Sequence, residues 1–143
     1  MTGCGECALC CKVMGVPELG KPRGLWCRHC DHQSCRIYAD RPRSCRDFEC
    51  LWLLSQRQPD ARLPRELRPD RSRVVMTVAK DGRSLIVHVD PDRPGHWRRR
   101  KVQQIIDRFL AAGEKVIVAI GDQRILLGHP RGAIDVPTND AVQ

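Results

Sequence analysis

The chain has 143 residues, which is enough for one ordinary domain or for a small metal domain joined to a small α+β domain. Hydrophobic residues make up 41% of it, but only 4% are aromatic, so the core must consist mainly of Val, Ile, Leu and Ala. The net charge of +8 raises the question of nucleic acid, whereas no stretch approaches the roughly 20 apolar residues of a membrane-spanning helix.

Nine cysteines lie in the first third of the chain, and none follows Cys50. Four of them form the run Cys4-x-x-Cys7-x-x-Cys10-Cys11, and the others are Cys27, Cys30, Cys35, Cys45 and Cys50. Short Cys-x-x-Cys steps let two sulfurs converge on one ion, and soft thiolates suit zinc or an iron–sulfur cluster. Because adjacent cysteines point apart, we expect Cys11 to serve a second ion. Nine thiols would then fill two four-sulfur sites, with one left over.

The redox compartment is inferred from the start of the chain. Cys4 follows directly on Met1-Thr2-Gly3, which leaves no room for an apolar secretion signal. We therefore expect a cytoplasmic protein, in which this cysteine pattern indicates metal binding rather than disulfides. Redox-active thiols and incidental thiols are the alternative interpretations.

Residues 1–57 are interpreted as a cysteine-cluster metal-binding region. Its first 35 residues have no helical or strand periodicity and are expected to form loops around metal. One helix is predicted to follow, with Asp40 as its cap, Pro42 in its first turn and its end near Ser55. Residues 58–73, rich in proline and charge, predict an extended, solvated connector.

Residues 74–128 are predicted to form a ββαββ domain, a four-stranded, mainly antiparallel sheet covered by one helix. Strands at 74–79 and 85–89 are joined around an Asp-Gly hairpin turn, and the alternation in the second strand predicts one buried face. An apolar stripe from Val102 to Leu110 indicates an amphipathic helix that ends at Gly113. Strands at 116–120 and 125–127 flank a turn at Gly121-Asp122. Residues 129–143 are predicted to be an irregular tail.

The cysteine pattern resembles the YkgJ-type cysteine-cluster proteins, a family described as zinc- or iron-chelating. The resemblance rests on the first cysteine run, on Gly24-Leu25-Trp26-Cys27, and on a block from Cys35-Arg36-Ile37-Tyr38 through Arg41-Pro42 to Cys45-Arg46-Asp47-Phe48-Glu49-Cys50. It covers about the first 52 residues, and the Asp90-Pro91 and Trp97 segment is similar to the end of some short members. The family also includes flagellin lysine N-methylases, but this chain has no room for their catalytic domain.

The resemblance implies eight metal ligands, which are Cys4, Cys7, Cys10, Cys11, Cys27, Cys35, Cys45 and Cys50. Cys30 lies outside the family's common core and is held as a substitute ligand or a spare thiol. His29 and His32 could also bind metal, although a histidine in a polar loop is more often solvated. Arg28, Arg41, Arg43 and Arg46 are expected to neutralise the thiolates, with a surface salt bridge to Asp47 or Glu49 as the alternative.

Three function classes follow from these observations. The first is a metal-binding protein that holds zinc or an iron–sulfur cluster, with a role in electron transfer, sensing or metal handling. The second is a basic zinc module that binds nucleic acid, although the positive charge is spread over both halves of the chain and the run Arg98–Lys101 fans around its helix. The third is an adaptor with structural zinc whose sheet docks a partner protein. No catalytic motif is present, so an oxidoreductase role would require an iron–sulfur cluster.

Overall fold

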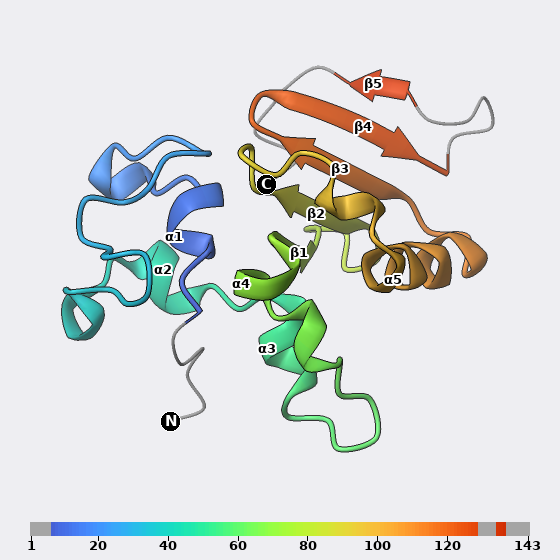
Figure 1. Ribbon diagram of the computed structural model, residues 1–143, viewed down its shortest axis with the longest axis horizontal. Coiled ribbons are helices and arrows are strands. Elements are labelled where there is room, and N and C mark those ends of the chain that lie inside the picture. The colour runs from blue at the N-terminus through green and yellow to red at the C-terminus, as the bar shows by residue number, and fades with distance from the viewer. Residues whose placement is uncertain (1–6, 129–133, 137–143) are drawn as a thin grey trace.

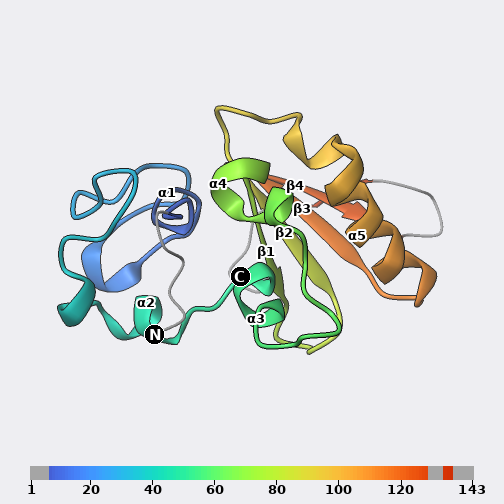
Figure 2. The ribbon, with the colours of Figure 1, turned by 60° about the horizontal axis from the view of Figure 1, so that its bottom comes forward.

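The computed structural model describes residues 7–128 and 134–136. Its fold is of the mixed α/β class, with a sheet, a covering helix α5 (Arg100–Ala111) and an N-terminal portion made of loops and short helices (Figure 1). The N-terminal portion contains the helices α1 (Cys10–Val13), α2 (Arg43–Asp47) and α3 (Leu51–Ser55), and the 3-10 turns η1 (Pro17–Leu19) and η2 (Tyr38–Asp40). It lies beside the sheet in both Figure 1 and Figure 2.

The sheet has the strand order β1-β2-β3-β4-β5. These strands are β1 (Val74–Val78), β2 (Leu85–Val89), β3 (Val116–Ile120), β4 (Gln123–Leu127) and β5 (Ile134–Val136). The pairings are antiparallel except for β2 with β3, which is parallel because helix α5 (Arg100–Ala111) carries the chain across between them. The order of β1, β2, α5, β3 and β4 is the predicted one. The prediction of an irregular tail was wrong for 134–136, which pair with β4.

The main core lies between α5 and one face of the sheet. Helix α5 contributes the predicted stripe, with Val102, Ile105 and Ile106 buried and Phe109 and Leu110 packed at the margin. The helix ends as predicted, since Gly113 follows its last residues with a φ of 80°, in the left-handed region that glycine tolerates. Trp97, in the 3-10 turn η4 (His96–Arg98) before α5, is buried in the same core.

The second sheet face is also covered, which corrects the expectation for β2. Leu85, Val87 and Val89 face α5, but Ile86 and His88 on the opposite face are buried as well. On that side Val75 packs against Leu9 and Val13 of the N-terminal portion. The alternation in β2 therefore marks two different burial environments, one for each face.

Three predictions of local structure were wrong. The helix expected from Asp40 to Ser55 is broken into η2, α2 and α3, because the residue before Pro42 is held extended and the chain is extended again at Phe48 and Cys50. Asp40 closes η2 rather than capping a helix. The turn between β1 and β2 is longer than two residues, since the backbone amide of Ala79 donates to the carbonyl of Ser84.

The connector 58–73 also departs from the prediction, because it is partly helical and partly buried. It holds the 3-10 turn η3 (Arg65–Leu67) and helix α4 (Pro69–Ser72), and Pro69 begins α4 where its missing amide hydrogen costs nothing. Leu67 is only 2% exposed and belongs to the main core. A connector with a buried anchor places α3 and β1 in a fixed relation.

Candidate metal centre

The cysteine thiols come from three stretches of chain that the loops bring side by side. No disulfide joins any two of the eight described cysteines, of which Cys7, Cys27, Cys30 and Cys50 are buried and Cys10, Cys11, Cys35 and Cys45 are half-buried. Cys4 lies outside the described residues.

Backbone hydrogen bonds fasten the second cysteine stretch to α1. The amide of Cys27 donates to the carbonyl of Cys11 at 3.0 Å, and the amide of Gly24 donates to the carbonyl of Lys12 at 2.9 Å. The amide of Cys30 then donates to the carbonyl of Cys27 at 3.0 Å, and Cys30 pairs with Cys35 in an isolated antiparallel bridge. This loop accordingly carries three cysteines past the end of α1.

Cys11 is the centre of the thiol contacts. Hydrogen bonds from the thiols of Cys10 and Cys30, helped by the positive charge of Lys21 and Arg41, outweigh burial and lower the pKa of Cys11 to about 6. Burial is the main reason that the pKa of Cys30 rises to about 12, and the neighbouring Cys11 adds to it. Cys11 is therefore mostly a thiolate near pH 7, the form of cysteine that binds metal.

Helix α2 brings Cys45 to the same place. Its position is fixed by Ser44, whose amide and hydroxyl both donate to the carboxylate of Glu18 at 2.9 and 2.8 Å. Burial raises the pKa of Cys45, and the neighbouring Cys11 and Cys35 raise it further because a second thiolate is disfavoured beside a first. We call Cys10, Cys11, Cys27, Cys30, Cys35 and Cys45 the six-thiol group.

Cys7 and Cys50 form a separate pair. Cys50 is 5% exposed, and its sulfur accepts from the amide of Leu53 at 3.5 Å, so it caps α3. Burial raises the pKa of Cys50, and the nearby Cys7 adds to that rise. Cys50 packs with Leu9, while Cys10 lies at the edge of the same apolar cluster. Cys10, a member of the six-thiol group, therefore also lies beside the cluster that contains Cys50.

Lys21 is the cation whose charge acts most strongly on Cys11, and its role was not predicted from the sequence. Burial lowers its pKa, while the charges of Cys27, Cys11 and other thiols oppose that change. Its ammonium donates to the carbonyls of Lys12, Met14 and Pro22 at 2.8, 2.5 and 2.9 Å. A single lysine in a loop carries no spacing signal, so only the fold reveals this role.

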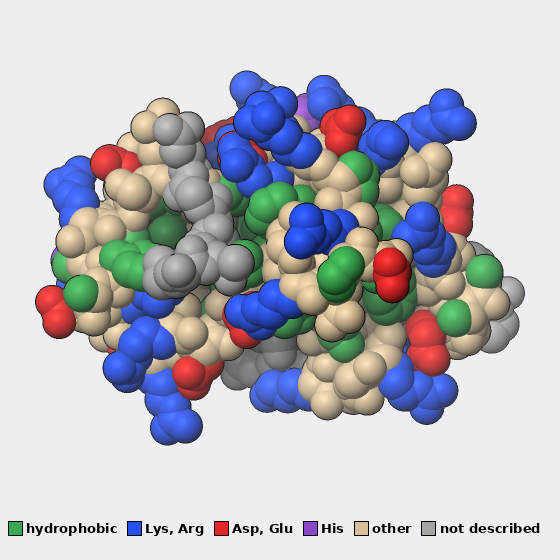
Figure 3. All heavy atoms as spheres, turned by 90° about the horizontal axis from the view of Figure 1, so that it is seen from below, with side chains coloured by type: hydrophobic (Ala, Val, Ile, Leu, Met, Phe, Trp, Pro, Cys, Tyr) green, Lys and Arg blue, Asp and Glu red, His purple; other side chains and the backbone are tan. Residues whose placement is uncertain are grey.

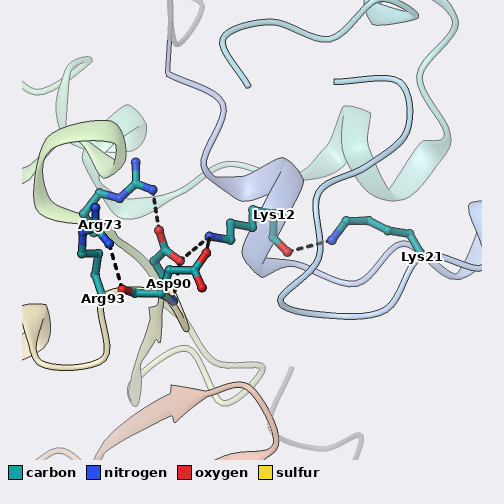
Figure 4. Close-up of polar contacts among 6 residues, drawn as sticks. Lys12, Lys21, Arg73, Asp90 and Arg93 are labelled. Carbon is teal, nitrogen blue, oxygen red and sulfur yellow. Dashed lines mark hydrogen bonds and ion pairs between the residues drawn. The ribbon is translucent and has the colours of Figure 1, made fainter. Parts of the chain in front are cut away.

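Lys12 connects the thiol region to the sheet (Figure 4). Its carbonyl accepts from Lys21, while its own ammonium points the other way and donates to Asp90 at 2.6 Å and to Asp92 at 2.5 Å. Asp90 is fully buried and also accepts from Arg73 at 2.5 Å. Burial disfavours the charged forms of both side chains. The hydrogen bonds to Asp90 and Asp92 nevertheless raise the pKa of Lys12, and the hydrogen bonds from Lys12 and Arg73 lower the pKa of Asp90.

The other side chains named from the sequence have varied positions. His32 is exposed and stacks on Trp26 with 4.1 Å between ring centroids, and His29 accepts from the side chain of Arg28 at 3.3 Å. Arg41 is the one of the four arginines whose charge acts on Cys11, while Arg43 forms the exposed ion pair with Asp47 that was the alternative. Glu49 pairs with Arg57 instead of these arginines.

The described part of the chain holds no group of three or more Cys, His, Asp or Glu side chains arranged to hold a metal ion. Within the six-thiol group, the sulfur of Cys11 instead accepts hydrogen bonds from the thiols of Cys10 and Cys30. The donor chemistry fits zinc or an iron–sulfur cluster, since both require thiolate ligands. Binding an ion would require the sulfurs to turn from each other toward it and to lose their protons.

No family model, curated protein or solved structure matches this chain. Within residues 7–128 and 134–136, every helix is too short or too polar to cross a bilayer. Any statement of function must therefore be built from the site itself.

Proposed function

We propose that this chain is a metal-binding protein, related to the YkgJ-type cysteine-cluster family, that holds zinc or an iron–sulfur cluster through cysteine. The observation that supports this most directly is that four thiols from three stretches of chain, those of Cys10, Cys11, Cys27 and Cys45, all lie near enough to Lys21 to act on its pKa. Soft sulfur donors in this number suit zinc and iron–sulfur clusters better than hard oxygen-seeking ions such as Mg²⁺ or Ca²⁺. Residues 1–57 would be the binding region, beside a ββαββ unit.

Two sites account for the arrangement of sulfurs. The other five members of the six-thiol group, Cys11, Cys27, Cys30, Cys35 and Cys45, supply the first, with Cys11 as the ligand whose pKa is lowered. Cys7 and Cys50 belong to the second, with Cys4 and Cys10 as the ligands that the chain pattern adds. When bound, zinc would hold these loops together or an iron–sulfur cluster would carry an electron.

The surrounding side chains have defined tasks in this proposal. Lys21 and Arg41 offset the negative charge of the bound thiolates, since each already lowers the pKa of Cys11. Trp26 packs against the buried Cys27 and Cys30 and limits their access to water. The carbonyls that hold Lys21 keep its ammonium in place whether or not metal is bound.

The nucleic-acid alternative receives no support from the charge distribution on the face in Figure 3. Lys and Arg side chains are spread over that face, with Asp and Glu among them. Within residues 7–128, several arginines are also paired with acids, including Arg43, Arg68 and Arg73. A focused basic surface is the feature that phosphate-driven binding needs.

Metal content of protein purified without oxygen tests the proposal. We expect two zinc ions per chain in a colourless protein, or iron with sulfide and visible absorption. Zinc would assign a structural or metal-handling role, and iron with sulfide would assign electron transfer or sensing. Protein that contains neither metal, and takes up neither after reduction and reconstitution, would refute the proposal.

Single substitutions then separate the two sites. Cys11→Ser should remove the metal of the six-thiol group, and Cys50→Ser should remove the other. Arg36→Ala is the matched control, because Arg36 is exposed and follows Cys35 directly. Equal metal content in the control and in Cys11→Ser would show that the six-thiol group does not bind the metal.

A further inference from the structure

A groove lies between the connector 58–73 and helix α5. Its volume is about 380 Å³, which is within the range of pockets that hold a small organic molecule. The connector contributes residues 60–64 and Leu67, and α5 contributes Lys101, Gln104, Ile105 and Arg108. The groove therefore has room for a ligand, and no cysteine lines it.

Hydrogen bonds with α3 hold the connector wall of the groove in place. The indole Nε1 of Trp52 donates to the carbonyl of Pro64 at 3.3 Å. The side-chain amide of Gln56 donates to the carbonyl of Leu63 at 3.3 Å, and the backbone amide of Leu63 donates to the hydroxyl of Ser55 at 3.1 Å. A wall fixed in this way is formed before a ligand arrives, which reduces the entropy that binding costs.

The groove has an apolar floor and a rim of cations. Leu63 is half-buried and Ile105 is only 4% exposed, so the floor is a margin of the main core. The exposed rim carries cations on both walls, with Arg62 on the connector and Lys101 and Arg108 on α5. Among the described residues that line the groove, Asp60 is the only acid, and no ion pair joins it to these three cations. The lining is therefore positively charged overall and suits an anion.

The helical repeat of α5 sets the separation between two of the cations. Lys101, Gln104 and Arg108 follow one another at steps of three and four residues, so they lie along one face of the helix. Lys101 and Arg108 start about two turns apart, which is roughly 10 Å along the helix axis. A ligand with an acidic group at each end can contact both cations at once, whereas a ligand with one acidic group contacts them one at a time.

We propose that this groove binds a small organic anion that carries an acidic group, carboxylate or phosphate, at each end. Lys101 and Arg108 contact the two acidic groups, and Arg62 contacts the ligand from the opposite wall. Ammonium and guanidinium groups form charge-assisted hydrogen bonds with both kinds of oxyanion. The carbon chain between the acidic groups lies on the floor at Leu63 and Ile105, where its burial is favourable. The site is additional to the proposed metal centre.

Calorimetric titration of the full chain with octanedioate tests the site, with octanoate titrated in parallel at constant ionic strength. The two molecules have carbon chains of equal length and differ by one carboxylate. We expect one octanedioate site per chain and octanoate binding that is about three- to fivefold weaker, the effect of one exposed ion pair. Lys101→Met and Arg108→Met should each weaken octanedioate binding by a similar factor, and the double variant by about tenfold or more. A hexose bisphosphate tests the phosphate form of the ligand.

A matched variant and a local signal show where the ligand binds. Arg100→Met is the control, because Arg100 is exposed on α5 next to Lys101 but does not line the groove. It should bind as the wild type does. The indole N–H signal of Trp52 in NMR should shift on titration, because that group donates to Pro64 in the groove wall. The signal of Trp26, which packs on Cys27 and Cys30, should stay in place.

Each outcome supports or overturns the proposal. Binding of octanedioate alone assigns a dicarboxylate and binding of the bisphosphate alone assigns a bisphosphate, while binding of both supports the need for two acidic groups. The proposal is overturned if neither binds, if octanoate binds as tightly as octanedioate, or if the double variant and Arg100→Met bind equally well. The substituted side chains are exposed, so these variants should fold. Metal content measured on the same samples keeps this result separate from the metal proposal.

Discussion

The ion pair between Lys12 and Asp90 should contribute much more to stability than an ordinary surface pair. Both side chains are nearly excluded from water, at 5% and 0% exposure, and their charged atoms are 2.6 Å apart. Lys12→Met keeps the apolar stem but removes the charge, which leaves Asp90 buried with Arg73 as its remaining cationic partner. Breaking a buried pair in this way costs about 3–5 kcal/mol, and Arg73 should keep the loss near 3 kcal/mol.

Urea unfolding followed by tryptophan fluorescence measures this loss, and Arg43→Met supplies the control. The pair of Arg43 with Asp47 is 85% and 68% exposed, so its removal should cause no measurable change. A double-mutant cycle of Lys12→Met with Asp90→Asn should give a coupling free energy of about 1–3 kcal/mol. A loss below about 1 kcal/mol for Lys12→Met would mean that water screens the pair and that our description of the junction is wrong.

Three further predictions concern packing and pH. Leu9→Ala should lower the free energy of unfolding by about 2–5 kcal/mol, measured in urea, because Leu9 is 1% exposed and packs on Val75. Burial lowers the pKa of His88 to about 3 in the folded protein, against an ordinary value of 6.5. The stability that depends on a neutral His88 should therefore be fully present above pH 6.5 and should be lost as the pH falls toward 3. His88→Gln should make the urea midpoint of unfolding depend less on pH between pH 6.5 and 5. The same pH dependence in the variant and the wild type would contradict this. Hydrogen bonds from Ser84 lower the pKa of Asp81 to about 2. The stability that this carboxylate contributes should be fully present above its ordinary pKa of 3.8 and should be lost as the pH falls toward 2. The NMR signal of its carboxyl carbon should titrate near pH 2.

The second half of the chain could be predicted because its signals are local. Helix α5 follows a 3.6-residue apolar period, and the strands are short β-branched runs separated by glycine turns. The turn at Gly121-Asp122 lies between β3 and β4 as predicted. In these segments each residue's partner is a few positions away or is set by strand register, so the sequence pattern alone is enough to predict the helix and the strands.

The N-terminal portion could not be predicted in the same way, because its structure depends on distant contacts. Cys50 interrupts the predicted helix since its sulfur caps α3 and its side chain is buried against Leu9. Lys21 has neighbours in three cysteine stretches, and none of them follows from its place in the sequence. The burial of Arg124 likewise arises from the packing of a loop on the sheet.

One turn of helix joins the thiols to the sheet. In α1, Cys10 and Cys11 belong to the six-thiol group, Lys12 forms an ion pair with Asp90, and Val13 packs in the cluster that contains Val75. These consecutive residues point in different directions because each helical residue turns by about 100°. A force that shifts α1 toward a bound ion must therefore also act on the Lys12 ion pair and on the Val13 contact. We infer that occupation of the thiols and docking of this helix on the sheet are energetically linked, since both use the same four residues of backbone.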